Sequence, residues 1–191
     1  KTTQDLRWHV DHSYRQYPSM GAMLYAVDVP AAGGDTLFAN MYKAYDDLSD
    51  SMKRFCEGLT AVHDVLAYGM DVGLLNTDKP EGFEYLKIMR ENFPPMEHPL
   101  VCTHPVTGRK FLYVNQSWVK RIPQLSNIES RHLISMLNEH STQLKYQCRF
   151  RWSNRDLIMW DNHSCIHSGV PDYVGKRAML RGSIEDHWVP A

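Results

Sequence analysis

Apolar residues gather in short runs along most of this chain, a pattern typical of short strands rather than of long helices. The first run, residues 20–29 (MGAMLYAVDV), is mostly apolar and predicts a buried strand. The glycine pair Gly33-Gly34 then predicts a turn. Residues 36–49 begin like a strand and pass into a helix, and residues 50–59 have the spacing of a second, amphipathic helix.

Two later segments have a strand–turn–strand pattern. Residues 98–115 (HPLVCTHPVTGRKFLYVN) predict a β-hairpin with its turn at residues 107–108. Residues 145–162 (KYQCRFRWSNRDLIMWDN) predict a strand, a turn at residues 153–154 and another strand. A last strand is predicted within residues 177–188 (RAMLRGSIEDHW).

Residues 127–141 predict a helix. We expect its apolar face to consist of Ile128, Leu133, Ile134 and Leu137. Residues 64–97 are polar and mixed and contain the breakers NTDKPEG and NFPP. This stretch is too long for an ordinary turn, so it predicts a functional loop, a lid or a mobile insert.

These elements predict a mostly β fold with flanking helices. A double-stranded β-helix, the jelly-roll or cupin-like barrel, is the natural candidate, because residues from distant strands can meet at its mouth. We expect residues 1–191 to form one domain. The first candidate motif stands only nine residues from the start, where chains usually fray, so we also expect an upstream part of the domain to be missing.

Composition narrows the function classes. Apolar residues make up 43% of the chain, charged residues 23%, and the formal net charge is −1, so charge gives no reason to expect nucleic acid or a membrane as partner. No apolar run reaches transmembrane length. The four cysteines show no CxxC pairing, which favours reduced thiols in a cytoplasmic protein. A homo-oligomer stays open.

The first candidate for chemistry is Trp8-His9-Val10-Asp11, which places a histidine and a carboxylate two residues apart. With 10 His and 22 acidic residues in the chain, such a triplet alone says little, and a metal site needs a third ligand from elsewhere. His163 and His167 follow a second apolar run, and both are candidates for that ligand.

The last strand adds a pair of arginines. Arg177, Met179 and Arg181 share one face, because strand side chains repeat every two residues. If that face points inward, two buried guanidinium groups require anions such as carboxylates or a sulfonate. The alternative is that the face points to solvent.

Together these motifs resemble the taurine dioxygenase and 2,4-dichlorophenoxyacetate dioxygenase family of Fe(II)- and 2-oxoglutarate-dependent oxygenases. The carriers are WHVD, GGDT, HPLVCTHPVTGRKFLYVN, RFRW, WDNHSCIH and KRAMLR, which occur in the family's order across nearly the whole chain. Members of that family also carry a stretch upstream of the first motif.

The resemblance implies that His9, Asp11 and His167 hold one Fe(II), with His163 as the competing third ligand. Two histidines and one carboxylate leave three positions on the metal open. The resemblance assigns two of them to 2-oxoglutarate and the last to O2. Because Asp11 is present, it also implies hydroxylation or another oxidation rather than halogenation.

The resemblance further implies that Thr36 and Arg177 hold the distal C5 carboxylate of 2-oxoglutarate, with Arg181 nearer the iron and the substrate anion. The stretch before Arg177 is one residue shorter than in better-known members, so either arginine is a candidate for the C5 carboxylate. His12 and Tyr14 are candidate substrate contacts, with packing as the alternative. Supporting or packing roles are expected for Trp8, Trp160, Asp161 and Asn162.

The function expected from the sequence is oxidation of a small, anionic organic substrate coupled to conversion of 2-oxoglutarate to succinate and CO2. Two alternatives use the same fold. A zinc-dependent hydrolase could use the same three ligands but has no use for Thr36 and paired arginines. An inactive ligand-binding barrel would have no reason to keep all three ligands.

Overall fold

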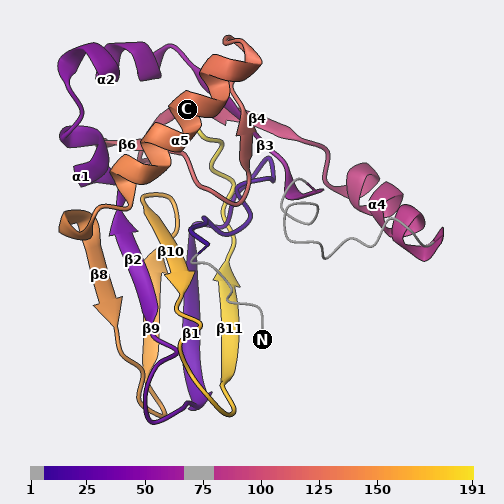
Figure 1. Cartoon of the computed structure of the whole chain (residues 1–191), viewed down its shortest axis with the longest axis vertical. Helices are drawn as coiled ribbons and strands as arrows, with labels where there is room; N and C mark the ends of the chain where they lie inside the picture. Colours follow the sequence, from indigo (N-terminus) through magenta and orange to yellow (C-terminus); the bar gives the residue numbers. More distant parts are fainter. Residues whose placement is uncertain (1–6, 67–79) are drawn as a thin grey trace.

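The computed structural model describes residues 7–66 and 80–191, and the account below concerns these residues (Figure 1). One antiparallel sheet has β1 (Gly21–Asp28) at its centre, between β9 (Leu157–Asp161) and β11 (Ala178–Ile184). The apolar run at residues 20–29 therefore forms the predicted strand, but only Gly21, Ala22 and Ala26 within it are buried.

A second antiparallel sheet has β2 (Thr36–Asn40) between β10 (Cys165–Gly169) and β8 (Gln147–Phe150). Its strands lie beside those of the first sheet in the lower half of Figure 1. Aromatic rings connect the two sheets: the Trp160 ring of β9 lies 5.4 Å from the Phe38 ring of β2, centre to centre. The inner faces of the two sheets therefore pack against each other.

The strands predicted within residues 145–162 both form, but they do not pair with each other. β8 pairs with β2, and β9 pairs with β1, so the turn at residues 153–154 carries the chain from one sheet to the other. Both predicted strands are therefore confirmed, and they belong to different sheets.

A third sheet places β3 (Thr60–His63) between β4 (Met96–Pro99) and β7 (Val119–Arg121). The predicted hairpin exists as β5 (Val101–Thr103) paired with β6 (Lys110–Leu112), and Gly108 in its turn has a positive φ of 66°. Such a backbone conformation favours glycine, which explains the Thr-Gly turn in the sequence.

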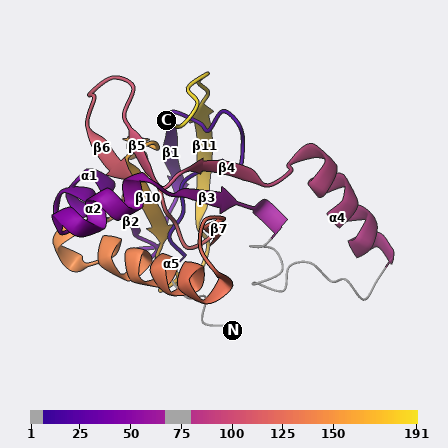
Figure 2. The ribbon, with the colours of Figure 1, turned by 90° about the horizontal axis from the view of Figure 1, so that it is seen from above.

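The loop predicted over residues 64–97 is partly wrong, because it contains β4 and the helix α4 (Pro80–Asn92). Its breakers bound the helix instead of interrupting it: Pro80 is the first helical residue, a position that suits proline, and two prolines follow the last turn. Figure 2 shows α4 standing apart from the sheets. Residues 67–79 of the predicted loop lie outside the described residues.

The other helices agree with the sequence pattern. α1 (Met41–Asp46) follows β2 directly, and α2 (Asp50–Glu57) begins after Ser49, whose side chain accepts a hydrogen bond from the backbone N–H of Met52. A short 3₁₀ turn, η1 (Leu144–Tyr146), precedes β8.

The helix predicted over residues 127–141 forms as α5 (Asn127–Ser141), with a complete capping box at its start. Leu133, Ile134 and Leu137 are buried as predicted, but Ile128 is 62% exposed. Ile128 and Leu137 are nine residues apart, which at about 100° per residue places them on opposite sides of the helix. The prediction that Ile128 belongs to the apolar face is therefore wrong.

The main core lies among α1, α5 and the hairpin, and Leu137 is fully buried within it. We predict that Leu137→Ala lowers the free energy of unfolding by about 2–5 kcal/mol, because it removes buried methyl groups and leaves a cavity. Chemical denaturation followed by circular dichroism measures this. Leu144→Ala, at a leucine that is 85% exposed, is the matched control and should change stability little.

The architecture is thus mostly β with added helices, and the described strands form separate sheets rather than a closed barrel. Among the described residues, no helix is both long and apolar enough to cross a membrane. All four cysteines are described, and each is a free thiol.

Candidate active site

A two-residue bridge between distant parts of the chain brings the candidate ligands together. The backbone N–H of His9 donates to the carbonyl of His167 at 3.0 Å, and the N–H of His167 donates to the carbonyl of His9 at 2.9 Å. His167 itself lies in β10, opposite Phe38 of β2. Because residues paired in this way present their side chains on the same face, the bridge aligns the two imidazoles.

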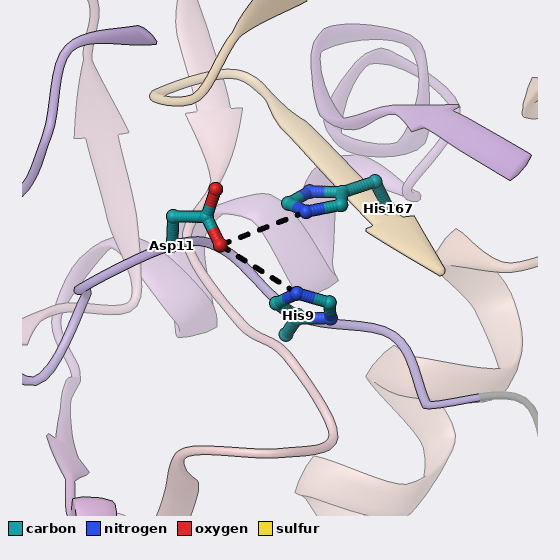
Figure 3. Close-up of side chains that lie close together, drawn as sticks. All are labelled: His9, Asp11 and His167. Atoms are coloured by element: carbon teal, nitrogen blue, oxygen red, sulfur yellow. Dashed lines mark ion pairs between the residues drawn. The ribbon is translucent and has the colours of Figure 1, made fainter. Parts of the chain in front are cut away.

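Asp11 completes the group, as Figure 3 shows. The Nε2 atoms of His9 and His167 each lie 3.6 Å from Oδ1 of Asp11, and the two ring centres are 4.2 Å apart. Asp11 and His167 are buried, whereas the His9 side chain is 27% exposed. The structure thus brings together the three residues that the sequence analysis named, in a group able to hold a metal ion.

The surroundings of both histidines favour the neutral imidazole, the form that binds a metal. Burial lowers the pKa of His9, against the opposing effects of the Arg7 carbonyl and of Asp11. Burial also lowers the pKa of His167, and nearby His9 and Arg181 lower it further. The Nδ1 of His9 lies 3.0 Å from the carbonyl of Arg7, to which it can donate, and this leaves the Nε2 lone pair free.

The carboxylate also fits a cation. Oδ2 of Asp11 is buried and has no hydrogen-bond partner within residues 7–66 and 80–191. A buried carboxylate oxygen without a donor is costly, and a metal ion would satisfy it. Two imidazole nitrogens and one carboxylate oxygen are the donor set of Fe(II) facial triads, and they also suit zinc.

Asn162 fixes the backbone of Asp11. It is completely buried, and its side-chain oxygen accepts from the N–H of Asp11 at 3.0 Å. Its amide nitrogen donates to the carbonyls of Asp11 at 2.8 Å and Ser19 at 2.9 Å. Three hydrogen bonds from one buried amide hold the ligand at the start of a turn in which His12 has a positive φ of 58°.

We predict that Asn162→Ala weakens metal binding about 10- to 100-fold, the usual effect of losing a group that orients a ligand. Titration of the metal-free protein with Mn(II), followed by electron paramagnetic resonance, measures the affinity. Asn92→Ala is the control, since Asn92 is exposed at the end of α4 and donates only to the carbonyl of Ile88. Equal affinities in the two variants would show that Asn162 does not orient Asp11.

Arg181 also reaches the group. It lies opposite Leu24 in the sheet, and Met179 lies opposite the buried Ala26, so the face of β11 that carries Met179 and Arg181 points inward. Arg177 precedes β11 and is not part of this face. One terminal nitrogen of Arg181 lies 2.5 Å from Oδ1 of Asp11, although the side chain is 44% exposed. Asp11 therefore supplies a carboxylate as counter-charge for Arg181.

Arg177 lies against Gly34, two residues before Thr36 at the start of β2. Thr36 is buried and pairs with Gly169, two residues beyond His167, or about 7 Å along the strand. Arg177 donates through Nε to the carbonyl of Gly34 at 3.1 Å. Within the described part of the chain, its two terminal nitrogens have no hydrogen-bond or ion-pair partner.

The sequence analysis missed the support of Thr36. The indole nitrogen of Trp152 donates to Oγ1 of Thr36 at 3.0 Å in a buried contact, which leaves the hydroxyl hydrogen free to donate elsewhere. Trp152 belongs to the RFRW motif, but its position in the sequence gives no sign of this contact, because the two residues are 116 positions apart.

The candidate substrate residues lie in the turn after Asp11. Nδ1 of His12 is 2.6 Å from the hydroxyl of Ser19. The Tyr14 ring packs edge-on against Trp118 at 5.1 Å and Phe93 at 5.6 Å, centre to centre. These aromatic neighbours, which the sequence analysis did not single out, connect the turn to the end of α4.

The supporting residues named from the sequence occupy different places. Trp8 is buried in the main core, and the Trp160 ring lies 4.8 Å from the ring of His167, centre to centre. Trp160 thus covers one side of the imidazole and, with Phe38, keeps that side apolar.

His163, the competing ligand, belongs to a second group with His104 and Asp161. Nε2 of His104 lies 3.0 Å from Asp161, and its Nδ1 accepts from the backbone N–H groups of Val106 and Thr107, both at 3.2 Å. With Nδ1 as acceptor, Nε2 of the neutral ring carries the proton and donates to Asp161. His104 and Asp161 are therefore hydrogen-bonded to each other and to the hairpin turn, whereas both ring nitrogens of the buried His163 have no hydrogen-bond partner among the described residues.

The match to a protein family agrees with this geometry. The model described as "Taurine catabolism dioxygenase TauD, TfdA family" matches residues 1–183. The chain belongs to the TauD/TfdA family.

Two relatives of this chain are dioxygenases by name. The chain is 38% identical over 174 residues to the alpha-ketoglutarate-dependent 2,4-dichlorophenoxyacetate dioxygenase of Cupriavidus pinatubonensis, covering 91% of this chain and 58% of the relative. It is 33% identical over 184 residues to the alpha-ketoglutarate-dependent sulfate ester dioxygenase of Pseudomonas putida, covering 93% and 60%. The chain thus spans about three-fifths of the length of these relatives.

Solved structures of TauD/TfdA-like enzymes have the same fold. AAD-2, crystallised with Mn(II) and N-oxalylglycine, matches with a TM-score of 0.84 and 34% identity, over 96% of this chain and 70% of that one. A taurine dioxygenase from Burkholderia xenovorans matches with a TM-score of 0.79 and 30% identity, over 96% and 57%. The resemblance seen in the sequence motifs is confirmed.

Proposed function

We propose that this protein is an Fe(II)- and 2-oxoglutarate-dependent dioxygenase that oxidises a small organic substrate, with release of succinate and CO2. The observation that carries the proposal is the His9, Asp11 and His167 group on the inner face of the paired sheets. Membership of the TauD/TfdA family supports it, since the relatives are named as alpha-ketoglutarate-dependent dioxygenases. AAD-2 was crystallised with Mn(II) and N-oxalylglycine, a close analogue of 2-oxoglutarate.

In this proposal, His9, Asp11 and His167 hold the iron, which when bound supplies the activation of O2 that no side chain can provide. The two neutral imidazoles donate nitrogen lone pairs, and the buried carboxylate balances part of the metal's charge. Asn162 keeps Asp11 in place, while Trp160 and Phe38 exclude water from one side of His167.

Thr36 and Arg177 receive the distal carboxylate of 2-oxoglutarate. The hydroxyl of Thr36 has a hydrogen to donate, and the terminal nitrogens of Arg177 provide a charged, forked donor. The distance of two strand residues between Thr36 and the position opposite His167 suits a five-carbon dicarboxylate that also reaches the metal.

We propose a small anion as the substrate, contacted by Arg181, His12 and Tyr14. Arg181 lies beside Asp11, where its charge can serve either the substrate or the near carboxylate of 2-oxoglutarate. The relatives are named for 2,4-dichlorophenoxyacetate and sulfate esters, which are both anionic. This is the class to test first.

The wider setting is also a proposal. The two facing sheets are taken as part of a double-stranded β-helix, within a single oxygenase domain that includes residues 1–191. The four free thiols support a cytoplasmic location.

The test is succinate formation from 2-oxoglutarate by the Fe(II)-loaded protein, with aryloxy acids, alkyl sulfates and sulfonates compared with neutral molecules of the same shape. We expect succinate to form in step with an oxidised product, and only when O2 is present. Product formation that continues without O2 and 2-oxoglutarate would contradict the proposal and indicate a hydrolase.

A further inference from the structure

The turn at Gly33-Gly34 touches the segment that carries Arg177. Both glycines have positive φ values, 77° and 72°. A Cβ atom on Gly33 would lie 2.6 Å from the backbone oxygen of Asp172, and one on Gly34 would lie 3.2 Å from Cδ of Arg177. Only glycine permits such close contact at these two positions, so Arg177 packs directly against the turn.

Asp172 holds the Gly33-Gly34 turn through hydrogen bonds. Its Oδ1 accepts from the N–H of Gly34 at 2.8 Å, and its Oδ2 accepts from Arg149 at 3.1 Å. Arg149 also donates through Nε to Asp35 at 2.6 Å. The backbone carbonyl of Asp35 accepts from the N–H of Val170 at 2.8 Å.

Among the described residues, Arg149 is the one side chain that pairs with both Asp35 and Asp172. Asp35 directly precedes Thr36, and Asp172 lies five residues before Arg177. Asp35 is buried, and its second oxygen has no hydrogen-bond partner in the described part of the chain, so it depends on Arg149 for its counter-charge.

Arg149 does not itself lie on the inner face. It pairs with Leu37 in the sheet, while the neighbouring Thr36 pairs with Phe150, so the side chains of Arg149 and Thr36 point to opposite faces. Its side chain is 52% exposed, and exposed ion pairs contribute little to global stability. Its influence on the site must therefore pass through the residues that it holds.

We propose that Arg149 is a positioning residue for the cosubstrate. By bridging Asp35 and Asp172, it keeps Thr36 and Arg177 in register to receive one distal carboxylate. This inference rests on the proposed function, because it assigns the far carboxylate of 2-oxoglutarate to Thr36 and Arg177.

The experiment compares two ligands on the full, Mn(II)-loaded chain by isothermal titration calorimetry. N-oxalylglycine has both the metal-chelating end and the distal carboxylate, whereas oxalate has only the chelating end. For Arg149→Gln, we expect N-oxalylglycine affinity to fall tenfold or more, while the affinities for oxalate and Mn(II) stay within twofold of the parent. A general loss of structure would weaken both ligands.

Arg109→Gln is the matched control, because Arg109 makes a similarly exposed ion pair with Asp46, at 54% exposure for each side chain. It should leave both affinities unchanged. Asp172→Asn is the second variant and should also lose affinity for N-oxalylglycine but not for oxalate. Combining it with Arg149→Gln should lower the N-oxalylglycine affinity little further.

Unchanged N-oxalylglycine affinity in both variants, or an equal loss of oxalate affinity, would overturn the inference. The parent protein could bind Mn(II) and oxalate but bind N-oxalylglycine no more tightly than oxalate. In that case Thr36 and Arg177 do not bind the distal carboxylate, and Arg149 has no positioning role. If the parent binds neither ligand, the proposed function itself fails.

Discussion

His167→Ala is expected to abolish both Fe(II) binding and 2-oxoglutarate-dependent turnover. The change removes one of the three metal donors. His9 and Asp11 remain, with their backbones fixed by the bridge and by Asn162, but two donors alone do not complete the site. Equilibrium dialysis against Fe(II) under anaerobic conditions, together with succinate assays, measures the two effects.

His163→Ala is the matched control, because His163 is also a buried histidine and lies only four residues away. It contacts the Trp188 ring at 4.2 Å, centre to centre, so the variant should lose stability but retain iron. Circular dichroism shows whether each variant is folded. Retention of iron by His167→Ala and its loss in His163→Ala would mean that the third ligand is misassigned.

Arg177→Ala is expected to weaken 2-oxoglutarate binding by about 2–4 kcal/mol, the effect of losing a charge-assisted, two-pronged partner. This corresponds to a loss in affinity of roughly 30- to 700-fold. The prediction follows from the place of Arg177 next to Gly34 and from its terminal nitrogens, which have no partner among residues 7–66 and 80–191. Titration calorimetry on the metal-loaded protein measures the change.

Lys176→Ala provides the comparison, since Lys176 is the neighbouring cation, is 76% exposed and pairs with Asp28. Removing the positive charge of Lys176 should leave the affinity for 2-oxoglutarate unchanged. If Arg177→Ala binds 2-oxoglutarate as tightly as the parent does, the distal carboxylate belongs to Arg181 instead.

Local patterns in the sequence predicted local structure well. The apolar run of β1, the spacing of α5 and the Thr-Gly turn between β5 and β6 each depend on residues close together in the chain. The same reasoning failed for α4, where prolines that bound a helix were read as signs of a loop. It also failed for Ile128, which lies nine residues before Leu137 and therefore points to the opposite side of the helix.

Pairing between distant segments could not be predicted from periodicity. Nothing in the sequence shows that β8 and β9 join different sheets, or that Arg181 pairs with Asp11, 170 positions away. The candidate ligands were found through motifs, which carry the long-range information that periodicity lacks. Residues such as Arg149 and Trp152, which act through their neighbours, became visible only in three dimensions.

The most direct test of the account is an anaerobic absorbance titration of the Fe(II)-loaded protein with 2-oxoglutarate. A chelated 2-oxoglutarate on Fe(II) held by two histidines and one carboxylate should give a visible charge-transfer band that saturates with ligand. We predict that band for the parent protein and its absence in Asp11→Ala. A colourless parent protein that still binds Fe(II) tightly would contradict the assignment of this site as the centre of a 2-oxoglutarate-dependent dioxygenase.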